Sequence, residues 1–235
     1  MKKWRKFERL VAMLTSEQYN EEEFTVIPNA KVRGFISGRK RQLDVLVDFR
    51  YDSDLSRRII FDAKDRSRPV DIKEVEMLEG MMKDVKARHG YIVCTSGYTK
   101  SALARAEQHI GIKLVTEAEV EDFDISNWDR CFTEGNCGGL VLWDAHPGII
   151  IDEKVTIHTL GKCDECGAFH VHCDGCGMTK AFYGDEDWQC GCEGPWFWLT
   201  STETEHGSTE LEYHANYLIL VLGNGQYQVV DRRAL

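Results

Sequence analysis

No stretch of the sequence approaches the roughly 18 consecutive apolar residues that a membrane-spanning helix needs. The basic N-terminal segment also lacks the uninterrupted apolar core and the small-residue cleavage site of a secretion signal. Extended disorder is not expected, because hydrophobic residues make up 43% of the chain and charged residues 29%, as in ordinary globular proteins. We therefore expect a cytoplasmic protein without a membrane partner.

An overall positive charge is lacking too, since the formal net charge is -10, which by itself argues against a nucleic-acid partner. The average hides an asymmetry along the chain. Residues 1–70 contain 16 Lys and Arg against 11 Asp and Glu, which leaves 13 basic against 28 acidic residues for the rest. The basic end favours contact with a phosphodiester backbone, although solvated loop charges would give the same pattern.

The periodicity of apolar residues predicts helices and strands in alternation over the first half of the chain. Helices are expected near residues 3–15, 75–85 and 99–110, and strands near residues 24–29, 42–49, 57–64, 90–95 and 112–116. This order predicts an α/β domain over residues 1–125, with a mixed β-sheet flanked by helices. An acidic segment ends this domain, and a smaller β-rich domain is expected over residues 126–235.

Three charged residues lie on two neighbouring predicted strands. Because side chains alternate along a strand, Asp44 faces away from its apolar neighbours, and Asp62 and Lys64 share the polar face of the next strand. Two such carboxylates suit Mg²⁺, with the Ala63 carbonyl as a possible third ligand. Lys64 would orient an attacking water and offset charge on a phosphate. Taken alone, the same residues would also fit exposed strand positions with an incidental ion pair.

Five separated segments resemble the catalytic domain of Mrr-like restriction endonucleases, within the PD-(D/E)xK nuclease superfamily. These segments, which span about residues 4–116, are FERLVAML, SGRKRQLDVLV, IIFDAKDRSRPVDIKEVEMLEGMMKDVKA, GYIVCTSGYTKSALARAEQ and GIKLV. The resemblance implies a sheet flanked by helices, Mg²⁺-dependent cleavage of DNA and an active site at Asp44, Asp62 and Lys64. It also implies a first-helix glutamate that assists metal binding, and Glu8 occupies that position. Many relatives have Glu, and some have Gln, where this chain has Asp62.

The resemblance leads to the hypothesis of a metal-dependent DNA endonuclease that acts on foreign or modified DNA. A structure-specific nuclease, such as a Holliday-junction resolvase, would use the same site. A different class is a catalytically silent scaffold that binds DNA or a protein partner. Cleavage of both strands usually requires two active sites, which is compatible with a homodimer.

Six of the nine cysteines crowd into residues 163–192. Two CxxCG segments, beginning at Cys163 and Cys173, are typical of turns in which two thiolates hold Zn²⁺ and the following glycine permits a tight backbone. Closed sites of this kind are usually structural. We expect structural zinc bound by cysteines of this segment: Cys163, Cys166, Cys173, Cys176, Cys190 and Cys192.

The grouping of these zinc ligands has two solutions. In a zinc ribbon, the second CxxC pair would bind with Cys190 and Cys192, and the first pair would bind another ion with His170 and His172. Alternatively, the two CxxC pairs would share one ion. Either arrangement supplies the four ligands that tetrahedral Zn²⁺ requires.

Three cysteines outside this segment, Cys94, Cys131 and Cys137, are expected to be unrelated to metal binding. Cys94 lies in an apolar run and is expected to be a buried thiol. The aromatic segment at residues 195–198 would serve as a base-stacking surface or in core packing, and core packing is the favoured interpretation.

Overall fold

The computed structural model describes residues 2–51, 54–106, 110–114, 123–126, 128–135, 137–151, 154–192, 194–204, 213–221 and 225–234. The chain divides into two compact units. The N-terminal unit comprises Met1–Gln18, Val26–Phe49 and Ser53–Asn127, and the C-terminal unit comprises Tyr19–Thr25, Arg50–Asp52 and Trp128–Leu235. Two early segments therefore belong to the later unit. The domain boundary at residue 125 stays a prediction.

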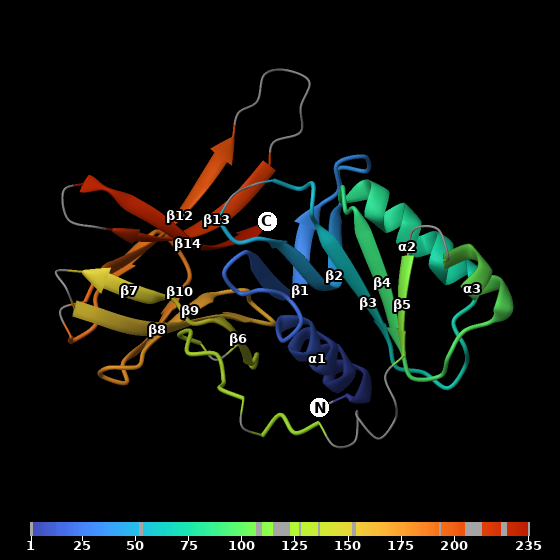
Figure 1. Cartoon of the computed structure of the whole chain (residues 1–235), viewed down its shortest axis with the longest axis horizontal. Helices are drawn as coiled ribbons and strands as arrows, with labels where there is room; N and C mark the ends of the chain where they lie inside the picture. Colours follow the sequence, from blue (N-terminus) through green and yellow to red (C-terminus); the bar gives the residue numbers. More distant parts are fainter. Residues whose placement is uncertain are drawn as a thin grey trace. The chain divides into compact units, whose positions relative to one another are not determined.

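The N-terminal unit contains a five-stranded sheet and three helices (Figure 1). Its strands, in sheet order, are β1 (Phe24–Arg33), β2 (Lys40–Phe49), β3 (Ile59–Lys64), β4 (His89–Cys94) and β5 (Ile110–Leu114). Its helices are α1 (Lys3–Ser16), α2 (Ile72–Asp84) and α3 (Lys100–Ala106). β2 and β3 are antiparallel, whereas β4 is parallel to both β3 and β5. The mixed α/β architecture expected from the sequence is confirmed.

The helices pack where their apolar faces meet the sheet. α1 contacts β2 and β3, α2 contacts β4 and α3, and α3 contacts β5. In α1 the buried residues include Phe7, Leu10 and Val11, which follow the spacing of one helical face. Among the described residues, no helix has the length and the apolar character needed to cross a membrane.

Helix α2 begins at a capping box. The Asp71 side chain accepts a hydrogen bond from the Lys73 backbone N–H (2.9 Å), and the Glu74 side chain accepts one from the Asp71 backbone N–H (2.8 Å). A cap of this kind stabilises a helix by about 1 kcal/mol. The helix then lies close to the sheet over Gly90, where a Cβ atom would come within 2.6 Å of the Met82 sulfur. Glycine in β4 therefore permits the close approach of α2.

The C-terminal unit is β-rich, as expected. Its strands are β6 (Val141–Ala145), β7 (Gly148–Ile151), β8 (Lys154–Cys163), β9 (Phe169–Cys173), β10 (Thr179–Phe182), β11 (Glu186–Trp188), β12 (Trp196–Thr204), β13 (Tyr213–Val221) and β14 (Tyr227–Ala234). One sheet has the order β10-β9-β8-β6, with β7 also paired to β8, and the other has the order β11-β12-β13-β14.

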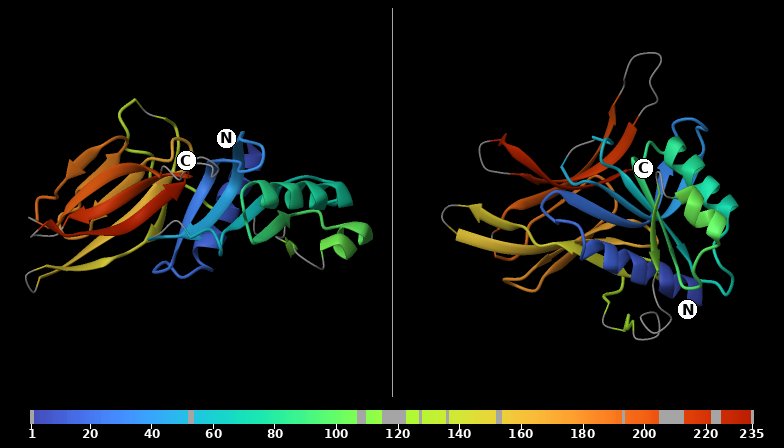
Figure 2. Two further views of the ribbon diagram at one scale, coloured as in Figure 1. Left: turned by 90° about the horizontal axis from the view of Figure 1, so that it is seen from above. Right: turned by 45° about the vertical axis from the view of Figure 1, so that its right-hand side comes forward.

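The two sheets of this unit pack face to face, and Figure 2 shows them as two layers. Strands of both sheets contribute to one buried apolar core, which consists of Ala145, Ile149, Leu160, Phe169, Val171, Phe182, Phe197, Leu199, Leu218, Leu220 and Val230. Because side chains alternate along each strand, the core residues of one strand are spaced by two, as in Phe169 and Val171, Phe197 and Leu199, and Leu218 and Leu220.

The aromatic segment near residue 196 shows this alternation. Phe197 and Leu199 of β12 are buried in the core, whereas Trp196 is 45% exposed and Trp198 is 40% exposed. Core packing therefore explains only part of the aromatic run. The sequence pattern around Gly223, Asn224 and Gly225 predicts a β-hairpin. β13 and β14 form an antiparallel pair there, and residues 222–224 of the predicted turn lie outside the described residues.

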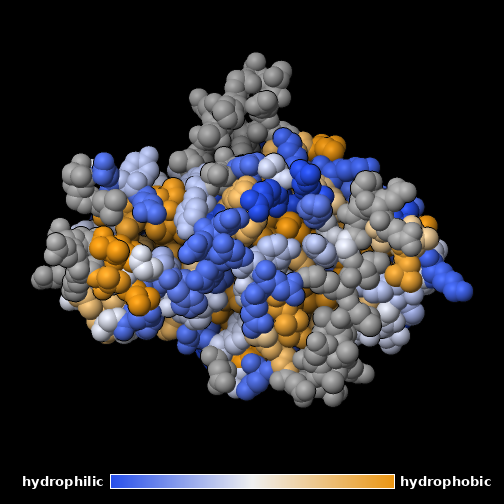
Figure 3. All heavy atoms as spheres, in the orientation of Figure 1, coloured by the Kyte–Doolittle hydropathy of each residue, from blue (hydrophilic) through white to orange (hydrophobic). Residues whose placement is uncertain are grey.

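Exposed apolar side chains gather on the hairpin of β7 and β8. Ile149 is buried in the core, but Ile150, Val155 and Ile157 are exposed on the opposite face. Figure 3 shows apolar surface over this part of the unit. The outer face of the hairpin is therefore accessible and apolar.

A buried ion network lies within the C-terminal unit. The Arg50 guanidinium is 3.1 Å from the Asp144 carboxylate and 3.0 Å from the Asp231 carboxylate. The Lys162 ammonium is 3.0 Å from Asp144 and 2.5 Å from Asp231. All four side chains are at most 1% exposed. Two cations and two anions thus neutralise each other inside the protein, which is how buried charges are tolerated.

Candidate active site

The two aspartates predicted to bind a metal lie on adjacent strands. β2 and β3 pair antiparallel with Val45 opposite Phe61 and Leu46 opposite Ile60, so the register, continued by one residue, puts Asp44 opposite Asp62. At this point the Asp44 carboxylate accepts a hydrogen bond from the backbone N–H of Ala63 (2.7 Å). That bond holds the Asp44 carboxylate against β3.

All four sequence-predicted residues of the active site line one cavity of about 390 Å³ in the N-terminal unit. Asp44 comes from β2, Asp62 and Lys64 come from β3, and Glu8 comes from α1. Apolar residues of α2, among them Met77, also line this cavity. The side chains of Asp62 and Lys64 remain 24% and 31% exposed, so the cavity is accessible from solvent.

The cavity carries more negative than positive charge. The Lys64 ammonium donates a hydrogen bond to Asp62 (2.5 Å), and the Arg5 guanidinium donates one to Glu8 (2.9 Å). The pKa of Asp44 is raised from 3.8 to about 7. Burial is the largest cause and the neighbouring charges of Asp62 and Glu8 add to it, while the hydrogen bond from the Ala63 N–H acts in the opposite direction. Asp44 therefore shares the cavity with carboxylates and lacks a full counter-charge.

This donor set fits a hard divalent cation. Carboxylate oxygens are the ligands that Mg²⁺ prefers, and a carboxylate with a raised pKa gains most from a nearby cation. Asp44 and Asp62 are the main candidate ligands, and Glu8 and Ala63 line the same cavity. The site therefore has the chemistry, oxygen donors and excess negative charge, that a catalytic metal requires.

The basic loop between β1 and β2 is anchored to the end of α2 by Asp84, a contact that the sequence did not reveal. The Asp84 carboxylate accepts hydrogen bonds from the backbone N–H groups of Ile36 (3.0 Å) and Ser37 (2.8 Å), from the Ser37 hydroxyl (2.8 Å) and from the Arg41 side chain. Burial alone would raise the pKa of Asp84, but these hydrogen bonds lower that pKa to about 2. The loop is thus fixed, while the basic residues on it and on the adjoining strand ends remain exposed: Lys31, Arg33, Arg39 and Lys40.

The cysteines of the C-terminal unit form two groups of four, and in each group all four sulfur atoms lie within 4.8 Å of one another. One group contains Cys173, Cys176, Cys190 and Cys192. The other contains Cys131, Cys137, Cys163 and Cys166. The two CxxC pairs are thus in different groups, so they do not share an ion. Four thiolates at this spacing can bind zinc.

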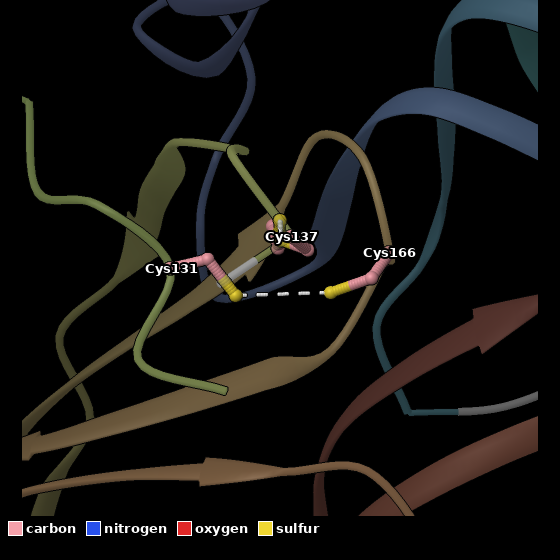
Figure 4. Close-up of side chains that lie close together, drawn as sticks. Cys131, Cys137 and Cys166 are labelled. Carbon is pink, nitrogen blue, oxygen red and sulfur yellow. Dashed lines mark hydrogen bonds between the residues drawn. The ribbon is translucent and has the colours of Figure 1, made fainter. Parts of the chain in front are cut away.

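The expectation that Cys131 and Cys137 are unrelated to the cysteine cluster is wrong. Cys131 Sγ lies 3.7 Å from Cys166 Sγ, and Cys137 Sγ lies 3.6 Å from Cys163 Sγ. Figure 4 shows Cys131 and Cys166 pointing toward each other. The sequence contained one clue to their role. If the second CxxC pair binds zinc with Cys190 and Cys192, the first pair needs two further ligands to complete a four-coordinate site. The Cys131–Cys137 spacing does not resemble a CxxC turn.

The two histidines considered as zinc ligands bond elsewhere. His170 Nε2 accepts a hydrogen bond from the backbone N–H of Phe132 (3.2 Å), and its Nδ1 lies 3.0 Å from the Ala168 carbonyl. His172 Nδ1 lies 2.8 Å from the Thr179 hydroxyl. Neither histidine belongs to a group of four. Cys94, by contrast, is a buried thiol as expected.

Comparison with known proteins locates a family in the first half of the chain. Residues 1–123 match the family model of the Mrr catalytic domain, described as a restriction endonuclease. No curated protein matches the chain. Among solved structures, the crystal structure of the protein of unknown function AF1548 is 22% identical, with a TM-score of 0.37 and coverage of 47% of this chain and 56% of that one. The chain thus spans about half the length of that relative.

The family match covers more than half of the chain, and it includes every residue that lines the cavity around Asp44 and Asp62. The cysteine groups lie beyond the matched residues. The protein therefore belongs to the Mrr-like restriction endonuclease family.

Proposed function

We propose that the protein is a divalent-metal-dependent endonuclease that hydrolyses phosphodiester bonds in DNA. One observation carries the proposal: Glu8, Asp44, Asp62 and Lys64 line a single cavity within the part of the chain that matches the restriction endonuclease family. Foreign or modified DNA is the proposed substrate. Cleavage of both strands would require two such sites, which favours a homodimer as the active form.

Asp44 and Asp62 would hold Mg²⁺, assisted by Glu8 and by the backbone carbonyl of Ala63. When bound, the cation supplies positive charge that polarises the phosphate and favours ionisation of the attacking water. Asp44 would give up its proton near neutral pH, because its pKa of about 7 falls when a cation lies beside it.

Lys64 would act on the phosphate. Its ammonium group donates a hydrogen bond to Asp62 (2.5 Å). Lys64 would exchange this bond for the phosphate oxygens when the Asp62 carboxylate turns to the cation. There its positive charge would stabilise the additional negative charge that develops as water attacks phosphorus and the bond to the leaving oxygen breaks.

The basic loop anchored by Asp84 supports a nucleic-acid substrate. The loop and the adjoining ends of β1 and β2 present exposed Lys and Arg side chains that can contact phosphates without reading the base sequence. Such contacts weaken as salt concentration rises, because counterions compete for the phosphates. Binding of DNA to this unit is therefore expected to be salt-dependent.

The test is cleavage of supercoiled, linear and single-stranded DNA with Mg²⁺ or Mn²⁺. Asp62→Asn and Lys64→Ala are each expected to lower the rate at least about 100-fold, the usual effect of removing a charge that stabilises the transition state. Glu76→Gln and Lys73→Ala are matched controls, since both residues are exposed on α2 away from the cavity. Equal activity of all four variants would contradict the proposal.

Two further measurements separate the alternative functions. Faster cleavage of four-way junctions than of linear duplex would indicate a structure-specific nuclease. A protein that binds Mg²⁺ equally well with and without Asp44→Asn, and that cleaves no DNA, would be a scaffold. The proposed endonuclease binds the cation more weakly when Asp44 is changed.

A further inference from the structure

The spacing of the cysteine sulfurs matches a tetrahedral metal site. Four thiolates bound to zinc at about 2.3 Å would lie about 3.8 Å from one another, the edge of the corresponding tetrahedron. In the structure the sulfur–sulfur distances are 3.7 Å for Cys131–Cys166, 3.6 Å for Cys137–Cys163 and 4.0 Å for Cys173–Cys192. A disulfide would bring two sulfurs to about 2.05 Å. The sulfurs are thus too far apart for disulfides and at the right distance to share an ion.

The same backbone turn presents both CxxC pairs. The Cys163 N–H bonds the Ala168 carbonyl (3.0 Å), and the Gly167 N–H bonds the Cys163 carbonyl (3.0 Å). The turn after Cys173 repeats this pattern with bonds of 2.9 and 2.8 Å. Gly167 and Gly177 have φ of 69° and 73°, a conformation that favours glycine. The two turns lie at opposite ends of β9, so each serves a different group.

A loop of the C-terminal unit brings the remaining ligands to the first group. Its ends are joined by hydrogen bonds from Cys131 N–H to the Gly139 carbonyl (3.0 Å) and from Val141 N–H to the Asp129 carbonyl (2.9 Å). The Gly139 N–H also points at Cys137 Sγ (3.4 Å). An N–H that faces a sulfur stabilises the charge of a thiolate. The loop thus favours the thiolate form of Cys137 and places Cys131 within the same group of sulfurs.

We propose that the C-terminal unit binds two zinc ions, one in each group of four cysteines, and that Cys131 and Cys137 complete the first site. Both sites are structural, because four protein ligands leave no open position for a substrate. The ion in the first site joins Cys131 and Cys137 to the turn between β8 and β9. The inference is independent of the proposed nuclease activity, since no residue of the cavity around Asp44 takes part.

Measurements on the wild-type protein identify the zinc ligands directly. Elemental analysis of the full chain is expected to give two zinc ions per chain, and X-ray absorption at the zinc edge should show four sulfur neighbours at about 2.3 Å without nitrogen. One ion per chain, iron in place of zinc, or a nitrogen ligand would overturn the assignment. This measurement needs no variant, so it stands even where substitutions prevent folding.

Variants assign each ion to its group. Cys131→Ser combined with Cys137→Ser is expected to lose one zinc ion of two, and Cys190→Ser combined with Cys192→Ser the other. Cys94→Ser, a buried thiol outside both groups, is the control and should keep two. Cys137→His should also keep two ions, but after exchange for Co²⁺ its visible spectrum should shift to that of a mixed sulfur and nitrogen site. Retention of both ions by the Cys131 and Cys137 double variant would overturn the proposal.

Discussion

Burial sets Asp44 apart from the other carboxylates of the cavity. Its pKa is about 7 in the folded protein against an ordinary value of 3.8. The folded state therefore holds a proton that an unfolded chain releases, and stability falls as the pH rises between these two values. Above about pH 7 the folded protein carries a buried charge, which a divalent cation would neutralise.

Asp44→Asn is accordingly expected to stabilise the metal-free protein at about pH 8. We expect a rise in Tm of at least about 2–4 °C, the change that ~1 kcal/mol produces in a chain of this size. At about pH 4 the gain should vanish, because Asp44 is then protonated in the folded state. Thermal unfolding with a chelator, at both pH values, measures this. A lower Tm for the variant at about pH 8 would contradict it.

Asp48 shows why a pattern of residues does not identify a site by itself. It lies four positions after Asp44 on the same face of β2, yet it is fully buried and forms a double hydrogen bond with Arg58 (2.8 and 2.6 Å). Strand alternation gives the two aspartates the same direction. Their different environments follow from the side chains that surround them, which the local sequence does not specify.

At the scale of elements, the apolar periodicity predicted the helices and strands of the N-terminal unit well. Helix α1 was expected at residues 3–15 and occupies Lys3–Ser16. The strand pair that carries Asp44 and Asp62 was also expected, because alternation and the family resemblance agree there. The long-range contacts were not predictable, since Cys131 meets Cys166 and Asp84 meets Ser37 only through the tertiary fold.

The loop between β1 and β2 depends on Asp84 for its conformation. We expect Asp84→Ala to weaken DNA binding several-fold while Mg²⁺ binding stays unchanged, because the basic residues lose their fixed positions. Loss of these hydrogen bonds should also cost about 1–3 kcal/mol of stability. Fluorescence anisotropy with labelled duplex, beside metal calorimetry, tests both parts, with Glu76→Gln as the control carboxylate. Unchanged DNA affinity would show that the loop does not contact DNA.

The acid stability of this loop follows from the same residue. The pKa of Asp84 is lowered from 3.8 to about 2. Its contribution to stability is therefore complete above 3.8 and is lost as the pH falls through about 2. The loss of Tm caused by Asp84→Ala should accordingly shrink at strongly acidic pH.

At the scale of the whole molecule, the buried ion network joins positions that are far apart in sequence. Lys162→Met would leave the carboxylates of Asp144 and Asp231 with Arg50 as the remaining cation of the network. Removing one partner of a buried ion pair costs about 3–5 kcal/mol. Lys180→Met is the matched control, because Lys180 and its partner Glu186 are both 33% exposed and such pairs contribute about 0–1 kcal/mol. Urea denaturation of both variants measures the difference.

A comparable loss of stability in the two variants would show that burial does not determine the strength of the network. Lys162→Met would then resemble a surface substitution, although its side chain is 1% exposed.

The backbone enters the C-terminal unit twice before the cysteines begin, at Tyr19–Thr25 and at Arg50–Asp52. A single genetic crossover near residue 125, which would suffice to exchange independent modules, would here separate Arg50 from Asp144 and Asp231. Each product would inherit unmatched charges. An exchange of C-terminal halves between relatives would therefore preserve the buried ion network only if the two early segments of the C-terminal unit were exchanged together with the later residues.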